Sequence, residues 1–158
     1  MPILNVKIAG KPDPETTRKV ASLLVDLTAT ILGKKREVTA VAIDYVPEEQ
    51  WFVGGSTLSQ QRKKSFYFDV KVTEGTNTKD EMARYVDAAF RGLQDILGEI
   101  HPASYISVED ARAFAWGYDG LTQEYRYIAN KARQHENAEL AGVDSKPNYL
   151  AELPQFKG

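Results

Sequence analysis

Cysteine is absent from this 158-residue sequence, and histidine occurs only twice. The lack of cysteine excludes disulfide scaffolds, thiolate zinc sites, iron–sulfur clusters and cysteine nucleophiles. The two histidines, His101 and His135, are too few for a histidine-rich metal site. The sequence therefore predicts no metal centre of these kinds, and any catalytic group has to come from other residue types.

An excess of charge is also missing, because 20 lysines and arginines stand against 22 aspartates and glutamates. This balance gives no overall positive field to attract nucleic acid. The longest apolar runs, such as residues 23–25, are far shorter than the ~18 residues that span a membrane, and no basic and apolar leader begins the chain. We therefore expect one soluble, cytoplasmic globular unit with neither nucleic acid nor a membrane as a partner.

The sequence does contain an internal repeat. Residues 4–8 and 68–72 lie about 64 residues apart, and both alternate apolar with polar residues. Alternation of this kind predicts half-buried strands. Each segment is followed by a turn-rich stretch, a helical period and a further apolar segment, at residues 38–46 in the first copy and 105–108 in the second. The predicted order of elements is therefore β-α-β, twice.

Capping residues mark both predicted helices. Asp13 is a typical N-cap residue for the first helix. Thr78 is the expected N-cap of the second helix, because Glu81, three residues later, gives the spacing of a capping box. Gly33 and Gly98 lie where each helix is expected to end in a left-handed residue. The residues expected on the buried faces are Val20, Leu23, Leu24, Leu27 and Ile31 in the first helix and Met82, Val86, Phe90, Leu93 and Leu97 in the second.

These elements predict an α/β (α+β) fold in which two consecutive β-α-β units form a four-stranded sheet with two helices on one face. The units are expected at residues 2–55 and 65–118, within a domain over residues 1–120. Residues 121–158 are expected to form a polar helix and an extended C-terminal segment, either disordered or wrapped around a neighbouring subunit. The open face of the sheet is expected to be apolar, and covering it favours a trimer.

Pro2 is the most informative single residue, because it follows Met1 directly. If Met1 is removed, Pro2 has a free secondary amine. Ordinary α-amines titrate near ~7.7–8.0, and lower when buried or beside a cation, so this group can act as a base near neutral pH. If Met1 remains, the nitrogen is a tertiary amide and cannot act as a base. The alternative is that Pro2 only opens a strand.

Several motifs follow Pro2 in a fixed order: Gly33-Lys34 after the first helix, Val46-Pro47 at the end of the first unit, and then Phe52-Val53-Gly54-Gly55. This order resembles the tautomerase superfamily, which includes 4-oxalocrotonate tautomerase, macrophage migration inhibitory factor and the chloroacrylate dehalogenases. The resemblance extends over about residues 2–118 and is strongest over 2–55; the two-unit length is most similar to the last two branches. It implies a homotrimer in which the amino-terminal proline acts at a pocket between subunits. No cofactor is implied, since proton transfer needs only a base of matched pKa.

The resemblance also implies substrate-binding residues. Lys34 matches a pocket lysine of the migration inhibitory factor and would pair with a substrate carboxylate or a developing enolate oxygen, although it could equally complement the helix dipole. Tyr105 matches a pocket tyrosine, and Ser107 takes the place of an asparagine. Lys11 lies near the sequence position at which the single-unit enzyme has a substrate-binding arginine. The position of that enzyme's second arginine falls near Ala42 in this sequence. Aromatic residues are expected to line the pocket, namely Trp51, Phe52, Trp116 and Tyr118, whereas Phe114 is expected in the core.

The predicted function is that of a cofactor-independent tautomerase, an isomerase that moves a proton on a 2-oxo acid or its enol, with Pro2 as general base. One alternative is a hydratase or dehalogenase that acts on an unsaturated carboxylic acid. The dehalogenase branch uses two arginines early in the second unit, and this chain has none between Lys63 and Met82. Another alternative is a non-catalytic trimeric protein of the same fold. The sequence does not identify the substrate beyond a small carboxylic or oxo acid.

Overall fold

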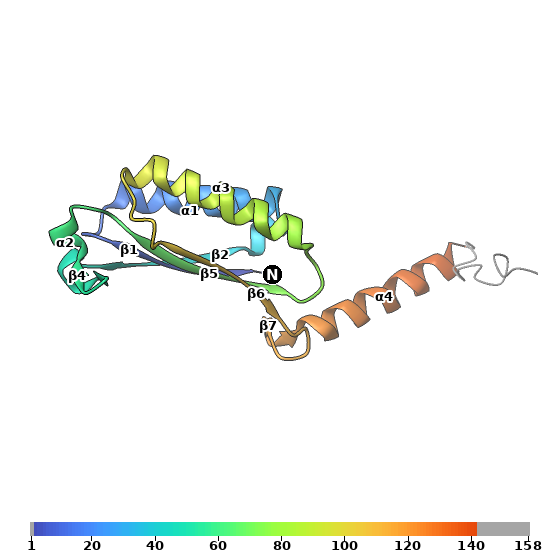
Figure 1. Ribbon diagram of the computed structural model, residues 1–158. Helices are drawn as coiled ribbons and strands as arrows, with labels where there is room; N and C mark the ends of the chain where they lie inside the picture. The colour runs from blue at the N-terminus through green and yellow to red at the C-terminus, as the bar shows by residue number, and fades with distance from the viewer. Residues whose placement is uncertain (1, 142–158) are drawn as a thin grey trace, which may run out of the picture.

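The computed structural model describes residues 2–141; Met1 and residues 142–158, which include the predicted extended C-terminal segment, lie outside the described part. The four strands of the main sheet have the order β2-β1-β5-β6. Helices α1 and α3 lie side by side on one face of this sheet (Figure 1). The predicted fold of two β-α-β units is thus confirmed. The first unit comprises β1 (Ile3–Ala9), α1 (Pro14–Thr30) and β2 (Ala40–Val46), and the second comprises β5 (Phe66–Thr73), α3 (Lys79–Leu97) and β6 (Tyr105–Ala111).

Strand pairing is parallel within each unit and antiparallel between the units, through β1 and β5. Ile3 lies opposite Ala40 on one side and opposite Lys71 on the other. The start of β1 is therefore next to the start of β2 and the carboxyl end of β5. As a result, the segment after α1 and the turn after β5 meet where the chain begins; this end of the sheet, which carries Pro2 and Lys34, is called the Pro2 end below.

Both predicted helix starts are confirmed. The carboxylate of Asp13 accepts a hydrogen bond from a backbone N–H in the first turn of α1 (2.8 Å). At the start of α3, the Thr78 hydroxyl oxygen accepts from the Glu81 N–H (3.2 Å), and a Glu81 carboxylate oxygen accepts from the Thr78 N–H (2.8 Å). The glycines at the predicted helix ends have positive φ, 65° at Gly33 and 89° at Gly98, which residues with a Cβ rarely adopt.

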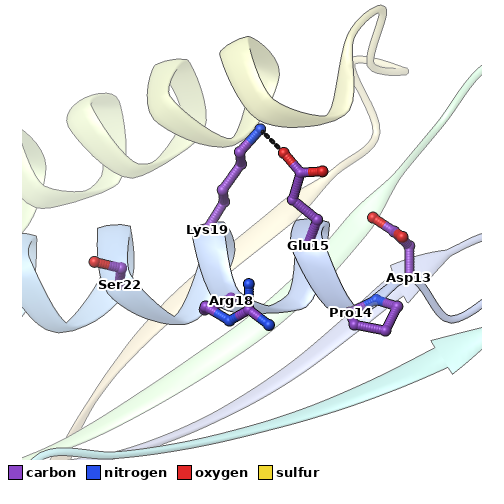
Figure 2. A pocket seen from close by; sticks show the side chains of 6 residues that line it. All are labelled: Asp13, Pro14, Glu15, Arg18, Lys19 and Ser22. Atoms are coloured by element: carbon purple, nitrogen blue, oxygen red, sulfur yellow. Dashed lines mark ion pairs between the residues drawn. The ribbon is translucent and has the colours of Figure 1, made fainter.

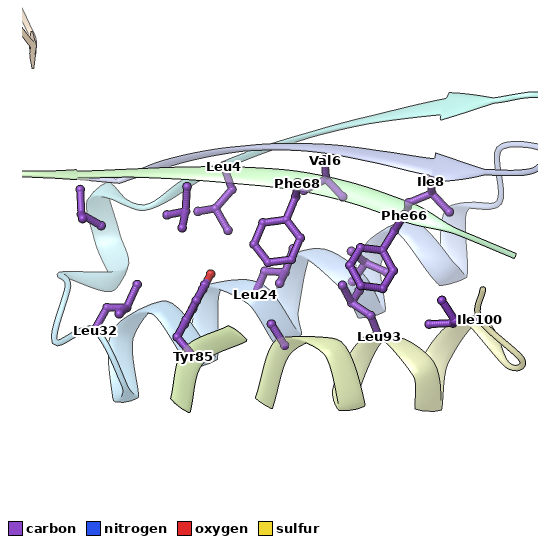
Figure 3. Close-up of a cluster of buried hydrophobic side chains, with 14 residues drawn as sticks. Leu4, Val6, Ile8, Leu24, Leu32, Phe66, Phe68, Tyr85, Leu93 and Ile100 are labelled. Atoms are coloured by element: carbon purple, nitrogen blue, oxygen red, sulfur yellow. The ribbon is translucent and has the colours of Figure 1, made fainter. Parts of the chain in front are cut away.

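The core lies between the sheet and the two helices (Figure 3). Its strand residues come from alternate positions, because successive side chains of a strand point to opposite faces. Helix α1 buries Val20 and Leu24 as expected. The buried strand residues are Leu4, Val6 and Ile8 in β1 and Phe66, Phe68, Val70 and Val72 in β5.

The buried stripe of α3 differs from the predicted one. Tyr85, Ala89 and Leu93 are buried, whereas Val86 is 37% exposed. Tyr85 can lie in the core because its hydroxyl forms a 3.0 Å hydrogen bond with the hydroxyl of buried Thr28 on α1. Burial raises the pKa of Tyr85 to about 12, so the phenol keeps its proton. The spacing of purely apolar residues could not predict a stripe that includes a tyrosine.

This buried pair gives a stability prediction. We expect Tyr85→Phe to lower the free energy of unfolding by about 1–3 kcal/mol, because the Thr28 hydroxyl is then left without a partner in the core. Thr28→Val should cost a similar amount for the reciprocal reason. The double variant buries no unpaired hydroxyl and should be no less stable than either single variant. Urea denaturation of all variants measures these differences, and strictly additive losses would contradict a coupled pair.

Each unit continues past its second core strand into a hairpin and a helix. The helices begin at Thr57 and Thr122, whose hydroxyl oxygens each accept a backbone N–H at 3.2 Å. The first backbone N–H of the helix in the first unit donates to the Trp51 carbonyl at 2.9 Å. In the second unit, the equivalent N–H donates to the Trp116 carbonyl at 3.0 Å. The structural repeat thus includes a hairpin and a helix in each unit, and residues 55 and 118 lie within the two hairpins. The elements are β3 (Phe52–Val53), β4 (Ser56–Thr57) and α2 (Leu58–Gln61) in the first unit, and β7 (Gly117–Tyr118), β8 (Leu121–Thr122) and α4 (Gln123–Leu140) in the second.

Helix α4 is much longer than its counterpart α2 and extends away from the sheet and the other helices (Figure 1). No residue of α4 is buried. Tyr125, Tyr127 and Ile128, near its start, are each more than half exposed. No helix among residues 2–141 combines the length and apolarity needed to cross a membrane.

The open face of the sheet is not apolar, which corrects the expectation. Asp69 lies there, only 7% exposed, and accepts hydrogen bonds from the Asn5 amide and the Lys71 ammonium, both at 3.2 Å. Lys71 also pairs with Glu109 on β6 at 2.8 Å. The ion-paired hydrogen bond to Glu109 is the main cause that raises the pKa of Lys71. These side chains occupy the face because the alternation that buries one set of strand residues turns the polar set to the other side.

Candidate active site

Pro2 is buried and directly precedes β1. Its carbonyl accepts a hydrogen bond from the Ala40 N–H at 3.1 Å, which extends the pairing of β1 with β2 by one residue. When the register of β1 with β5 is extended by one residue beyond the pair Ile3–Lys71, Pro2 lies beside the buried Val72. The Pro2 carbonyl is therefore held by the hydrogen bond from the start of β2, and the proline lies next to an apolar side chain of β5. A buried amine at this position would have its pKa lowered by desolvation, which favours the basic form.

Lys34 lies at the same end of the sheet. It directly follows Gly33, and its backbone N–H donates to the carbonyl of Thr28 at 3.2 Å. The side chain is half-buried, and its ammonium donates to the hydroxyl oxygen of Thr76 at 2.7 Å. Burial is the largest influence on this group and lowers the pKa of Lys34, while the carboxylates of Glu81 and Asp110 act in the opposite direction.

The second hairpin also belongs to this end. Thr73 of β5 lies opposite Ala111 of β6, and the Glu74 N–H donates to the Ala111 carbonyl at 3.0 Å, so β6 delivers the chain into the β7–β8 hairpin near the Pro2 end. Residues 114–118, together with 120–122, surround a hollow of about 280 Å³. Within residues 2–141, no group of three or more His, Cys, Asp or Glu side chains is placed to hold a metal ion.

Two aromatic residues of the predicted lining, Trp116 and Tyr118, are among those around this hollow. Phe52, on the first hairpin, is 62% exposed. Phe114 is 56% exposed, so its predicted place in the core is wrong. It lies between β6 and β7, beyond the last strand residue that packs against the helices, and this position removes it from the core.

The other predicted site residues do not lie beside Pro2 in the same chain. Lys11 follows the far end of β1 and is exposed, and Tyr105 begins β6 opposite Tyr67, also far from Pro2. The length of β1 separates the two ends by roughly 20–25 Å, since a strand rises about 3.3 Å per residue. Ser107 is half-buried in the middle of β6 and lies opposite Asp69. In a single chain, Pro2 and Lys34 therefore lie at one end of the sheet, whereas Lys11 and Tyr105 lie at the other.

Other hollows of the surface lie away from the Pro2 end. Lys11 lines two at the opposite end, of about 400 and 290 Å³, together with Lys64, which forms an ion pair with Glu48. Figure 2 shows another, over the first turns of α1, where Lys19 and Glu15 form an exposed ion pair at 2.7 Å. The residues that line this hollow are surface side chains of one helix, and none is a predicted site residue. It therefore has no relation to the predicted chemistry.

Comparison with known proteins supports the resemblance predicted from the sequence. The family model described as tautomerase enzyme matches residues 2–61, which include Pro2, Lys34 and the first hairpin. These residues therefore match the tautomerase family. The resemblance predicted from the sequence is thereby confirmed, and the match covers the first unit of the fold. A search of curated protein sequences finds no match to the chain.

The two-unit tautomerase fold is shared with solved structures. A native fused 4-OT is 17% identical, with a TM-score of 0.70, covering 78% of this chain and 97% of that chain. The protein Pt0534, inactivated by 2-oxo-3-pentynoate, is 13% identical, with a TM-score of 0.70, covering 78% and 98%. A macrophage migration inhibitory factor-like protein from Entamoeba histolytica is 19% identical, with a TM-score of 0.64, covering 77% and 97%. At these identities the likeness concerns the fold.

Proposed function

We propose that the protein is a cofactor-independent tautomerase in which Pro2, once Met1 is removed, is the general base. The observation that carries this proposal is the buried position of Pro2 at the start of β1, at the same end of the sheet as the half-buried Lys34, in a unit of the tautomerase family. The hydrogen bond from the Ala40 N–H to the Pro2 carbonyl holds this residue in place, and the apolar neighbours favour the neutral form of its nitrogen. Both properties are needed by a base that works near neutral pH.

The chemistry is a proton transfer on a small 2-oxo acid. The Pro2 amine takes a proton from the carbon next to the carbonyl, and the electrons of that C–H bond move to form an enolate. Lys34 stabilises the enolate oxygen or holds the substrate carboxylate, since a cation placed where negative charge develops lowers the barrier. The protonated proline then returns the proton at another atom of the conjugated system, and the amine is regenerated. The inactivation of Pt0534 by an unsaturated 2-oxo acid supports this substrate class.

The second unit does not offer an equivalent site. Tyr67 and Tyr105 pair as Ile3 and Ala40 do, so Phe66 takes the place of Pro2 in the second unit. Phe66 is a fully buried core residue without a basic group. The counterpart of Lys34, directly after Gly98, is an exposed acidic residue, Glu99, which pairs with Lys63 at 3.5 Å. We therefore assign the chemistry to the Pro2 end alone.

We also infer a homotrimer with the pocket between subunits. Two fused 4-OT structures are described as trimers, one symmetric and one asymmetric. Lys11 and Tyr105 lie at the far end of the sheet from Pro2, so only another copy of the chain can bring them to it. In a trimer these side chains would complete the site with a second cation and a phenol. The polar network of Asp69 and Lys71 on the open face would then lie toward other copies.

The proposal is tested by changing only the amino terminus. Intact mass first shows whether Met1 is absent from the purified protein. The processed protein should tautomerise phenylpyruvate or a 2-hydroxydienoate. The activity of a form with one glycine added before Pro2 should be at least ~100-fold lower, because its proline nitrogen is an amide. Matching thermal unfolding of the two forms is the control for folding.

Two results would refute the proline mechanism. One is equal activity of the processed and extended forms. The other is a processed protein without activity on any oxo acid, which would favour a non-catalytic protein of the same fold. Hydration or dehalogenation of unsaturated acids is assayed in parallel, because the same base could activate water.

A further inference from the structure

We propose that Thr76 and Asn77, in the turn between β5 and α3, are positioning residues for Lys34, so that the second unit orients the cation of the first unit's site. The catalytic consequence rests on the proposed function. The positioning itself rests on hydrogen bonds between the two units, and it can be tested without any activity.

The hydroxyl of Thr76 is oriented by the turn that carries it. It donates its only proton to the carbonyl of Thr73 at 2.5 Å. The oxygen therefore has only acceptor capacity left, and it accepts from the Lys34 ammonium at 2.7 Å. A lysine side chain is otherwise flexible and loses much rotamer freedom when it is fixed. This hydrogen bond consequently directs an ammonium that the lysine side chain alone would not hold in one place.

Asn77 anchors the backbone that precedes Lys34 to the second unit. Its amide donates to the carbonyl of Leu32 at 3.0 Å and to a carboxylate oxygen of Glu81 at 3.2 Å. Leu32 lies just beyond α1, where carbonyls have no partner within the helix. The same Glu81 oxygen also accepts the Thr78 N–H at the start of α3. The backbone just before Lys34 is therefore anchored to the start of α3. The Lys34 side chain is anchored to Thr76.

The chemical nature of this anchor matters. Among residues 2–141, Lys34 forms no ion pair, and its one side-chain hydrogen bond goes to a neutral hydroxyl. An ammonium has three N–H donors, so two remain for a substrate anion, and the positive charge is not cancelled by direct contact with a carboxylate. Glu81 and Asp110 are the charged groups near it on α3 and β6, and Pro2, at the same end of the sheet, would add an amine after processing. Glu81 is already engaged by Asn77 and Thr78.

The test compares Thr76→Val, which keeps the shape but removes the acceptor, with Thr76→Ser, which restores it. Thr30→Val is the matched control, because it removes an exposed threonine hydroxyl that donates to a backbone carbonyl, that of Asp26, at 2.8 Å. The pKa of Lys34 is measured by competitive acetylation and mass spectrometry over alkaline pH. A hydrogen bond to the charged form favours that form, so Thr76→Val should lower the pKa of Lys34, while Thr76→Ser and Thr30→Val should leave it as in wild type.

Kinetics supply the second measurement. Thr76→Val should lower kcat/KM by about tenfold, the loss expected for one hydrogen bond to a charged group, and should cost little more when Lys34 is already alanine. A folded Thr76→Val protein with an unchanged Lys34 pKa would overturn the proposal, even if its activity fell. If the wild type proves to have no tautomerase activity, the proposed function fails, and the titration of Lys34 still decides whether Thr76 positions it.

Discussion

Replacement of Pro2 by alanine is expected to lower kcat by about 10²–10⁴, the contribution of a well-placed acid or base. Alanine at the amino terminus leaves a primary amine in place of the ring-constrained secondary amine. Its basicity differs, and the nitrogen can rotate away from the position that the proline ring and the pairing with Ala40 impose. Steady-state kinetics on phenylpyruvate and on a 2-hydroxydienoate measure the effect.

Amino-terminal processing has to be confirmed by intact mass for both proteins, since a retained Met1 would abolish the amine in either. Thermal unfolding controls for the loss of the buried ring. Equal turnover of processed wild type and processed Pro2→Ala on every oxo acid tested would remove the proline base from the mechanism. It would then favour a protein of this fold that binds a ligand without changing it.

Lys34→Ala is expected to lower kcat/KM by about 10²–10³, as the loss of a preorganised oxyanion contact does. The matched control is Lys35→Ala, because Lys35 is the adjacent exposed lysine near the same helix end. If these lysines only complement the helix dipole, the two variants should behave alike. A raised KM with unchanged kcat indicates a contact to a ground-state carboxylate, whereas a lowered kcat indicates stabilisation of the enolate.

The pH dependence gives an independent check on the same residue. Burial lowers the pKa of Lys34, so its positive charge is lost at lower pH than that of an exposed lysine. Activity that needs this charge should therefore fall as pH rises through the Lys34 pKa. Lys34→Arg keeps its charge to much higher pH and should remove that alkaline decline if it retains activity. A decline that persists unchanged in Lys34→Arg would assign the titration to another group.

The elements of the fold were predictable because their signals are local. Alternation set the faces of β1 and β5, and the side chains of Asp13 and Thr78 marked the helix starts. The buried stripe of α3 was not predictable from apolar spacing, since Tyr85 is buried only because Thr28, on another helix, supplies its hydrogen bond. Such pairs become visible only when two distant segments are packed together.

Topology alone decides where two of the predicted site residues lie. Pro2 precedes β1 and Lys34 lies between α1 and β2, and the parallel return of the chain places both at one end of the sheet. Thr76 was missed, although the antiparallel pairing of β1 with β5 puts the turn after β5 at that same end. Lys11 and Tyr105 could not be placed at the site, because any contact they make with Pro2 involves a second copy of the chain.

The second unit carries Phe66 and Glu99 at the positions equivalent to Pro2 and Lys34, so the two ends of the sheet differ chemically. In an assembly of identical single-unit chains, every mutation changes all copies of a site at once. Joining two units in one chain removes that constraint, because a substitution then alters only one end of the sheet. A strand start inside the chain cannot carry a free amine, and the phenylalanine found there is a fully buried core residue. The turn at residues 74–77 of the second unit nevertheless lies at the Pro2 end, where the Thr76 hydroxyl accepts a hydrogen bond from Lys34.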